Sequence, residues 1–184
     1  MIRLALALCA LLLAACGADP VRVPQTTLVQ SDLRDRASVS TVMLREVSLP
    51  TYAAAEEVAV QAADGTIQQN PDILWADEPA RFVTLQLTQH LNVISTATVA
   101  PEPWPLDDIP DVTVDVRVSR MLATNSGTFD LTGQFFVGGD GRPFRANATP
   151  FVISVPLGAA GIEGIPQAQA AAVLQLAETI ARAL

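Results

Sequence analysis

Hydrophobic and polar residues alternate most clearly over residues 112–118, where valine occupies every second position. Because successive side chains of a β-strand point to opposite faces, this segment predicts a strand with one apolar face. The same period of two continues over residues 129–137, after a turn at 124–127, and another strand is expected over 151–155. These segments predict an antiparallel meander.

Shorter strand patterns precede the meander. Strands are expected over residues 39–49, where Pro50 ends the pattern, and over 57–61. The pair Asp64-Gly65 is typical of a hairpin turn, so the chain should return over 66–69 and continue over 71–75.

Two segments have helical spacing. Asp77 is expected to cap the first helix, with Pro79 in its first turn. Val83, Leu87 and Leu91 form one apolar stripe, and this helix should end near residues 91–92. A further strand is expected over 93–99. The last helix should begin near Pro166 and bury one apolar face: Val173, Leu176, Ala177, Ile180, Ala181 and Leu184.

Strands, a helix, more strands and a final helix predict an α/β fold, with an antiparallel or mixed β-sheet and two main helices packed on it as an α/β sandwich. Loops are expected over residues 100–110, which contain four prolines, and over 158–164, which contain three glycines.

The N-terminus has the pattern of a bacterial lipoprotein signal. Arg3 precedes an apolar run that ends in Leu13-Ala14-Ala15-Cys16. The run of about 12 residues is shorter than the roughly 20 that a membrane-spanning helix needs. We therefore expect cleavage before Cys16 and lipidation of its thiol and amine; ordinary cleavage near Ala15 with an unmodified Cys16 is the alternative. Residues 1–15 would be the signal peptide, 16–37 the lipidated N-terminus and tether, and 38–184 a single domain.

Composition restricts the chemistry of that domain. The formal charge of −8 argues against nucleic acid as a partner. Cys9 would leave with the signal and Cys16 would be acylated, so the domain would have no disulfide and no catalytic thiol. No cofactor is expected beyond the covalent lipid on Cys16. Gly17 rather than aspartate follows the cysteine, which favours the outer membrane, facing the periplasm.

Candidate catalytic or metal-binding groups are few. The single histidine, His90, is expected on the surface or at a helix C-terminus rather than in catalysis. Asp107, Asp108 and Asp111 could hold calcium, but their spacing favours a solvated acidic loop. Residues 138–141 favour a hairpin turn over a phosphate cradle, because strand residues follow. We therefore predict no catalytic, cofactor-binding or metal-binding residues. Trp104, an aromatic residue in the proline-rich loop, is a candidate partner contact.

Two short motifs carry a family resemblance. Leu49-Pro50-Thr51-Tyr52 follows the first expected strand, and Leu74-Trp75-Ala76-Asp77-Glu78-Pro79 opens the first helix, with Asp77 as one residue more than the usual form. With the lipobox and the strand over 112–120, the chain resembles the ABC-type transport auxiliary lipoprotein family. The resemblance implies partnership with an ABC transporter and its periplasmic MCE-domain protein in moving lipids between membranes. It also implies a possible homo-oligomer.

The sequence therefore predicts a non-enzymatic lipoprotein, anchored in the outer membrane by Cys16, that docks or binds a protein of an MCE/ABC-type lipid transport system. A general envelope-assembly accessory lipoprotein of a pore or secretion complex is the alternative. A periplasmic hydrolase is less favoured, since no convergent set of titratable groups is evident.

Overall fold

The structure is a computed structural model that describes residues 20–24, 30–139 and 144–184. Within these residues eight strands form one mixed, open sheet. The strands are β1 (Val21–Val23), β2 (Thr41–Leu44), β3 (Glu57–Gln61), β4 (Ile67–Trp75), β5 (Thr98–Pro101), β6 (Val112–Ala123), β7 (Thr128–Gly138) and β8 (Asn147–Pro156). The helical segments are α2 (Thr51–Ala54), α3 (Pro79–Ile94), the 3-10 segment η1 (Gly158–Gly164) and α4 (Ile165–Ala181).

Strand β6 is the centre of the sheet. Along one edge it pairs in parallel with β2 near its start and with β3 near its end, and along the other it pairs antiparallel with β7. Strand β8 continues the meander on the far side of β7. The α/β fold and the meander predicted from the alternating residues are confirmed.

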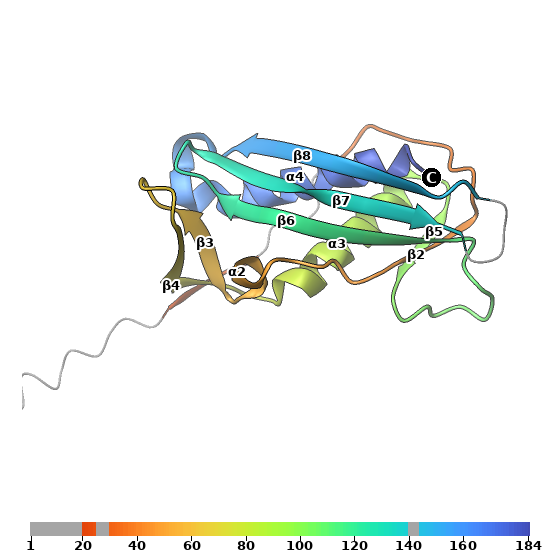
Figure 1. Ribbon diagram of the computed structural model, residues 1–184, viewed down its shortest axis with the longest axis horizontal. Helices are drawn as coiled ribbons and strands as arrows, with labels where there is room; N and C mark the ends of the chain where they lie inside the picture. Colours follow the sequence, from red (N-terminus) through yellow and green to blue (C-terminus); the bar gives the residue numbers. More distant parts are fainter. Residues whose placement is uncertain (1–19, 25–29, 140–143) are drawn as a thin grey trace, which may run out of the picture.

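Helices α3 and α4 lie side by side against one face of this sheet (Figure 1). Leu87 and Leu91 of α3 and Leu176 and Ile180 of α4 are completely buried, and so are the first three of the alternating valines of β6, Val112, Val114 and Val116. The apolar stripes predicted for the two helices therefore form the core between the two layers, which makes the fold a two-layer sandwich.

Strand β6 continues five residues beyond its predicted end at Val118. A β-bulge at this point interrupts the alternation of apolar and polar residues on which the prediction is based. The register with β7 shifts between Val118 and Arg120, so Ser119 is the extra residue. Beyond the bulge the odd-numbered Met121 and Ala123 pack in the core, and the even-numbered Leu122 between them is buried as well. A period-two pattern cannot extend through such a shift.

The Leu-Pro-Thr-Tyr motif completes the edge of β6 between β2 and β3. The Ser48 N–H donates to Val116 O at 3.0 Å, and Ser48 O accepts from the Val118 N–H at 2.9 Å. The next free amide along this edge, the Met121 N–H, donates to the Tyr52 hydroxyl oxygen at 3.3 Å. Tyr52 therefore takes the place of a strand partner where no strand is present.

We expect Tyr52→Phe to destabilise the domain by about 1 kcal/mol, because the Met121 N–H loses its partner while the ring is kept. Urea unfolding of the purified mature chain, followed by circular dichroism, measures the change. An unchanged midpoint would show that the hydroxyl does not contribute to this edge.

Other boundaries of strands and helices also differ from the sequence predictions. Strand β2 ends at Leu44 rather than Leu49, because the chain leaves the ladder and the Val47 N–H donates to Thr84 Oγ1 of α3 at 2.9 Å. Helix α3 extends to Ile94, which is buried, so the strand expected over 93–99 is replaced by the shorter β5.

The N-cap of α3 is Glu78 without a side-chain hydrogen bond, rather than Asp77. The Asp77 carboxylate instead accepts the Glu78 N–H at 2.8 Å and pairs with Arg81. The hydrogen bond from Arg81 holds the pKa of Asp77 below its ordinary value.

Parts of the stretch expected to be a tether are bound to the domain. Val21 and Val23 pair in parallel with Ile73 and Trp75 of β4. Further along, the Ser31 hydroxyl donates to Glu178 Oε1 of α4 at 2.6 Å. These two segments before residue 38 therefore contact the folded domain.

Candidate functional site

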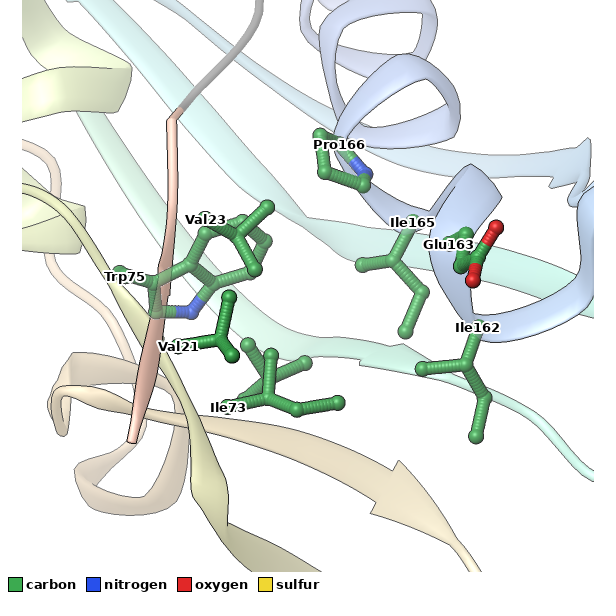
Figure 2. Close-up of a pocket in the computed structure, with 9 residues that line it drawn as sticks. Val21, Val23, Ile73, Trp75, Ile162, Glu163, Ile165 and Pro166 are labelled. Atoms are coloured by element: carbon green, nitrogen blue, oxygen red, sulfur yellow. The ribbon is translucent and has the colours of Figure 1, made fainter. Parts of the chain in front are cut away.

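An apolar pocket of about 220 Å³ lies between β1 and the start of α4 (Figure 2). Its strand side is formed by Val21, Val23, Val58, Ile73 and Trp75. Its helix side is formed by Ile162, Ile165 and Pro166, with the exposed Glu163 as the charged residue of the lining. A pocket with this lining favours apolar ligands, because it offers few hydrogen-bonding groups to water.

Strand β1 forms one wall of this pocket because its side chains alternate. Val21 and Val23 line the pocket, whereas Arg22 points to the other side and its Nη1 lies 3.2 Å from Glu56 Oε2. The same nitrogen donates to Trp75 O at 3.3 Å, and the Ala76 N–H donates to Val23 O at 3.1 Å. These contacts attach β1 to the end of β4.

Trp75 of the second family motif lies at the back of the pocket and is buried, as expected of a core residue. Pro79 of the same motif occupies the first turn of α3, where its missing N–H costs nothing. The motif thus ends β4, begins α3 and supplies an aromatic wall to the pocket.

A second, more polar pocket of about 400 Å³ has His90 in its lining. Its lining includes Ser31, Asp32 and Arg34 from the N-terminal stretch and Val93 from α3. The prediction that His90 lies on the surface is wrong, because the residue is only 3% exposed. Its Nε2 has no hydrogen-bond partner among the residues that the structure describes. Burial lowers the pKa of His90 below its ordinary value of 6.5, although the nearby Glu178 carboxylate opposes the shift.

His90 should make the domain less stable in acid. Because the folded state disfavours the charged imidazole, the unfolded chain binds a proton more readily as pH falls below 6.5. The contribution of neutral His90 is therefore fully present above pH 6.5 and is lost below it. We expect His90→Leu to lose less unfolding free energy between pH 8 and pH 5 than the wild type, as measured by urea unfolding. Parallel pH curves for the two proteins would contradict this assignment.

Trp104 lies in the loop between β5 and β6, as expected for a residue of the proline-rich segment. Its indole Nε1 donates to Asp108 O at 2.7 Å, which closes the loop on itself. Leu106 and Ile109 project from this loop, and Ile109 is 74% exposed. The loop therefore presents apolar side chains to solvent between the acidic residues Glu102, Asp107 and Asp108.

The three aspartates of the loop are not brought together as ligands. Asp111 is buried and accepts the backbone N–H groups of Ser40 and Thr41 at 2.8 and 3.1 Å, so it fastens the start of β6 to β2. Asp107 and Asp108 are exposed. Across residues 20–24, 30–139 and 144–184, no group of three or more His, Cys, Asp or Glu side chains is arranged to hold a metal ion.

Two sequence predictions fall wholly or partly on residues that are not described. Cys16 lies outside the described residues, and so do residues 140 and 141 of the turn expected at 138–141. The strands on either side of that turn pair antiparallel, with Val137 opposite Asn147, as a hairpin requires. Within the described part of the chain, no helix has the length and hydrophobicity to cross a membrane.

The model of one protein family, the ABC-type transport auxiliary lipoprotein component, matches residues 24–181. The chain belongs to this family. The match begins at the end of β1 and ends with α4, so it covers nearly the whole auxiliary lipoprotein domain. The family resemblance inferred from the two short motifs is confirmed.

Solved structures share the fold of this auxiliary lipoprotein. A crystal structure of an uncharacterized protein aligns with a TM-score of 0.68 and 18% identity, over 82% of this chain and 98% of the other. A protein from Xanthomonas campestris aligns with a TM-score of 0.65 and 13% identity, over 88% and 92% of the two chains. No curated protein matches the chain.

The apolar pocket was not predicted from the sequence. Its lining comes from four separate segments, and Val21 and Val23 lie in a stretch that the proline content and mixed charges assign to the tether. The available signal was the alternation of Val21, Arg22 and Val23, which is too short to distinguish a strand from a linker.

Proposed function

We propose that this auxiliary lipoprotein is anchored in the outer membrane through Cys16, faces the periplasm, and serves an MCE/ABC-type lipid transport system as a docking or binding component. The family match over residues 24–181, directly after a lipobox, is the observation that carries the proposal. The family's name supports association with an ABC transport system. The MCE-domain protein as partner follows from the family resemblance of the sequence motifs.

The proposed role is non-enzymatic. Family membership supports it, and so does the arrangement of the titratable groups in the described residues. His90 is buried beside Glu178. In the β5–β6 loop, Asp111 is buried and accepts a backbone hydrogen bond from Ser40, whereas Asp107 and Asp108 are exposed. Binding of another protein requires none of the convergent groups that a catalytic site needs.

The shape of the domain suggests that anchoring and docking take place at opposite ends of it. The short strand β1, which follows the lipidation site in the sequence, lies at one end of the long axis, and the β5–β6 loop lies at the other (Figure 1). A domain held to the membrane at the β1 end can present Trp104 and its neighbours away from that attachment. We propose this loop as the contact for a protein partner.

Affinity purification of the lipidated protein from detergent-solubilised envelopes, followed by mass spectrometry, tests the proposal. We expect an MCE-domain protein among the most abundant partners, together with its permease or ATPase. Recovery of components of a pore or secretion complex without any MCE protein would favour the envelope-assembly alternative and overturn the proposal.

In the same purification, we expect Trp104→Ala to reduce recovery of the MCE protein by at least about tenfold, because tryptophans that anchor interfaces typically contribute 2 kcal/mol or more. Val152→Ala is the matched control, since Val152 is 84% exposed but lies on β8. Trp104→Phe removes the hydrogen bond to Asp108 O and keeps a ring, so it separates loop shape from contact. Equal recovery with Trp104→Ala and Val152→Ala would exclude Trp104 from the interface.

A further inference from the structure

The apolar pocket lies close in sequence to the lipidated residue. Val21, at the start of its strand wall, is five residues after Cys16. We propose that the pocket receives one fatty acyl chain carried by Cys16 of the same molecule. This inference rests on the lipidation of Cys16, which is part of the proposed function.

The pocket has the chemistry of an acyl-chain site. Valine, isoleucine, tryptophan and proline side chains form nearly all of its surface, and its volume is about 220 Å³. An apolar cavity of roughly 150 Å³ already stays dry and binds benzene, so this pocket is large enough for a segment of an alkyl chain. Val21 and Ile162 stand at its rim with 66% and 51% of their surface exposed, which extends the apolar surface toward solvent.

The chain of Cys16 is within reach of the pocket. Five extended residues span at most about 18 Å, so the thiol and amine of Cys16 stay within that distance of Val21 plus the length of a side chain. A ligand tethered this closely acts at an effective concentration of about millimolar, without competing from solution.

Charge favours the protein's own acyl chain over that of a bilayer phospholipid. Glu163 is the charged residue among those that line the pocket, and the whole chain has a formal charge of −8. A phosphate headgroup held at this rim would meet a like charge. The thioether-linked diacylglyceryl group and the amide-linked acyl chain of a lipidated Cys16 carry no charge, so an acyl chain of Cys16 can enter without that repulsion.

Moving a chain from the bilayer into the pocket exchanges one apolar environment for another, and the pocket walls gain contacts that water does not provide. Stable membrane attachment needs two or more chains, and a triacylated Cys16 retains two when one is withdrawn. The β1 end of the domain would then be fixed close to the membrane surface rather than connected by a free tether.

Photo-crosslinking of the full, lipidated protein tests this proposal in two arms. In the first, cells are fed a fatty acid that carries a diazirine, and the purified lipoprotein is placed in nanodiscs of unlabelled phosphatidylethanolamine and irradiated. In the second, unlabelled lipoprotein is placed in nanodiscs that contain diazirine-labelled phosphatidylethanolamine. Peptide mass mapping locates the crosslinks in both arms.

We expect crosslinks at Ile73, Trp75, Ile162 or Ile165 in the first arm only. Ile73→Trp, which fills the pocket, should lower that yield about tenfold, whereas Val152→Trp, which adds the same ring on exposed β8, should leave it unchanged. Circular dichroism verifies that both variants fold. If Ile73→Trp does not fold, the comparison of the two arms with the wild-type protein still tests the proposal.

Two results would overturn the inference: labelled lipoprotein with no pocket crosslinks, or equal pocket labelling by the phospholipid. The mass of the N-terminal peptide separates this failure from that of the proposed function. An acylated Cys16 without pocket crosslinks removes only the inference, whereas an unacylated Cys16 also removes the anchor.

Discussion

Replacing Cys16 by alanine is expected to move the protein from the membrane fraction to the soluble periplasm. The reason is that Cys16 is the predicted attachment point of the acyl chains. Each methylene buried in the bilayer contributes about 0.8 kcal/mol to attachment, so the loss of two or three long chains removes the whole anchor.

Fractionation of cells, a high-salt wash of the membranes and immunoblotting measure this relocation. Cys9→Ala is the matched control, because Cys9 lies in the apolar run that is predicted to be removed with the signal, so this change should leave the protein in the membrane. Intact mass shows whether residues 1–15 have been cleaved from each variant. A cleaved Cys16→Ala chain that stays with salt-washed membranes would contradict anchoring by lipid.

The sheet and its two helices could be predicted because their patterns are local and uninterrupted. Alternating valines continue through Val118, and the helical stripe from Val83 to Leu91 is buried as predicted. Prediction failed where a distant partner decides the local structure. Strand β2 is shortened because Val47 donates to Thr84, and β6 is prolonged beyond its bulge with help from the Tyr52 hydroxyl.

The candidate sites also differ in whether the local sequence could predict them. Trp104 could be named because an aromatic residue among prolines is unusual within one loop, and the structure shows it bonded to Asp108 of that loop. The apolar pocket could not be named, because Val21, Ile73 and Ile165 come together only when β1 docks on β4 beside α4. The polar pocket lined by His90 likewise forms only where the N-terminal stretch around Ser31 lies beside α3, which nothing around His90 in the sequence indicates.

Gly133 shows the strongest steric requirement near the β6 bulge. A Cβ at this position of β7 would lie 2.2 Å from Arg117 O and 2.9 Å from Val118 Cα, both in the backbone of β6. It would also lie 2.8 Å from Cζ of Phe151, which is opposite Gly133 on β8. Since real Cβ atoms do not approach backbone this closely, any larger residue must separate the two central strands of the meander.

We expect Gly133→Ala to destabilise the domain by about 3 kcal/mol, at the upper end of the usual cost of overpacking, because backbone rather than a flexible side chain must move. Gly138→Ala, on the same strand, is the matched control. Among the described residues, no atom apart from Gly138 and its chain neighbours lies within 4 Å of the added Cβ, so the effect should stay within about 0.5 kcal/mol. Urea unfolding of the two mature variants measures the difference. Similar midpoints would mean that β6 and β7 adjust at the bulge without loss of pairing, and would remove the close approach as the reason for glycine at this position.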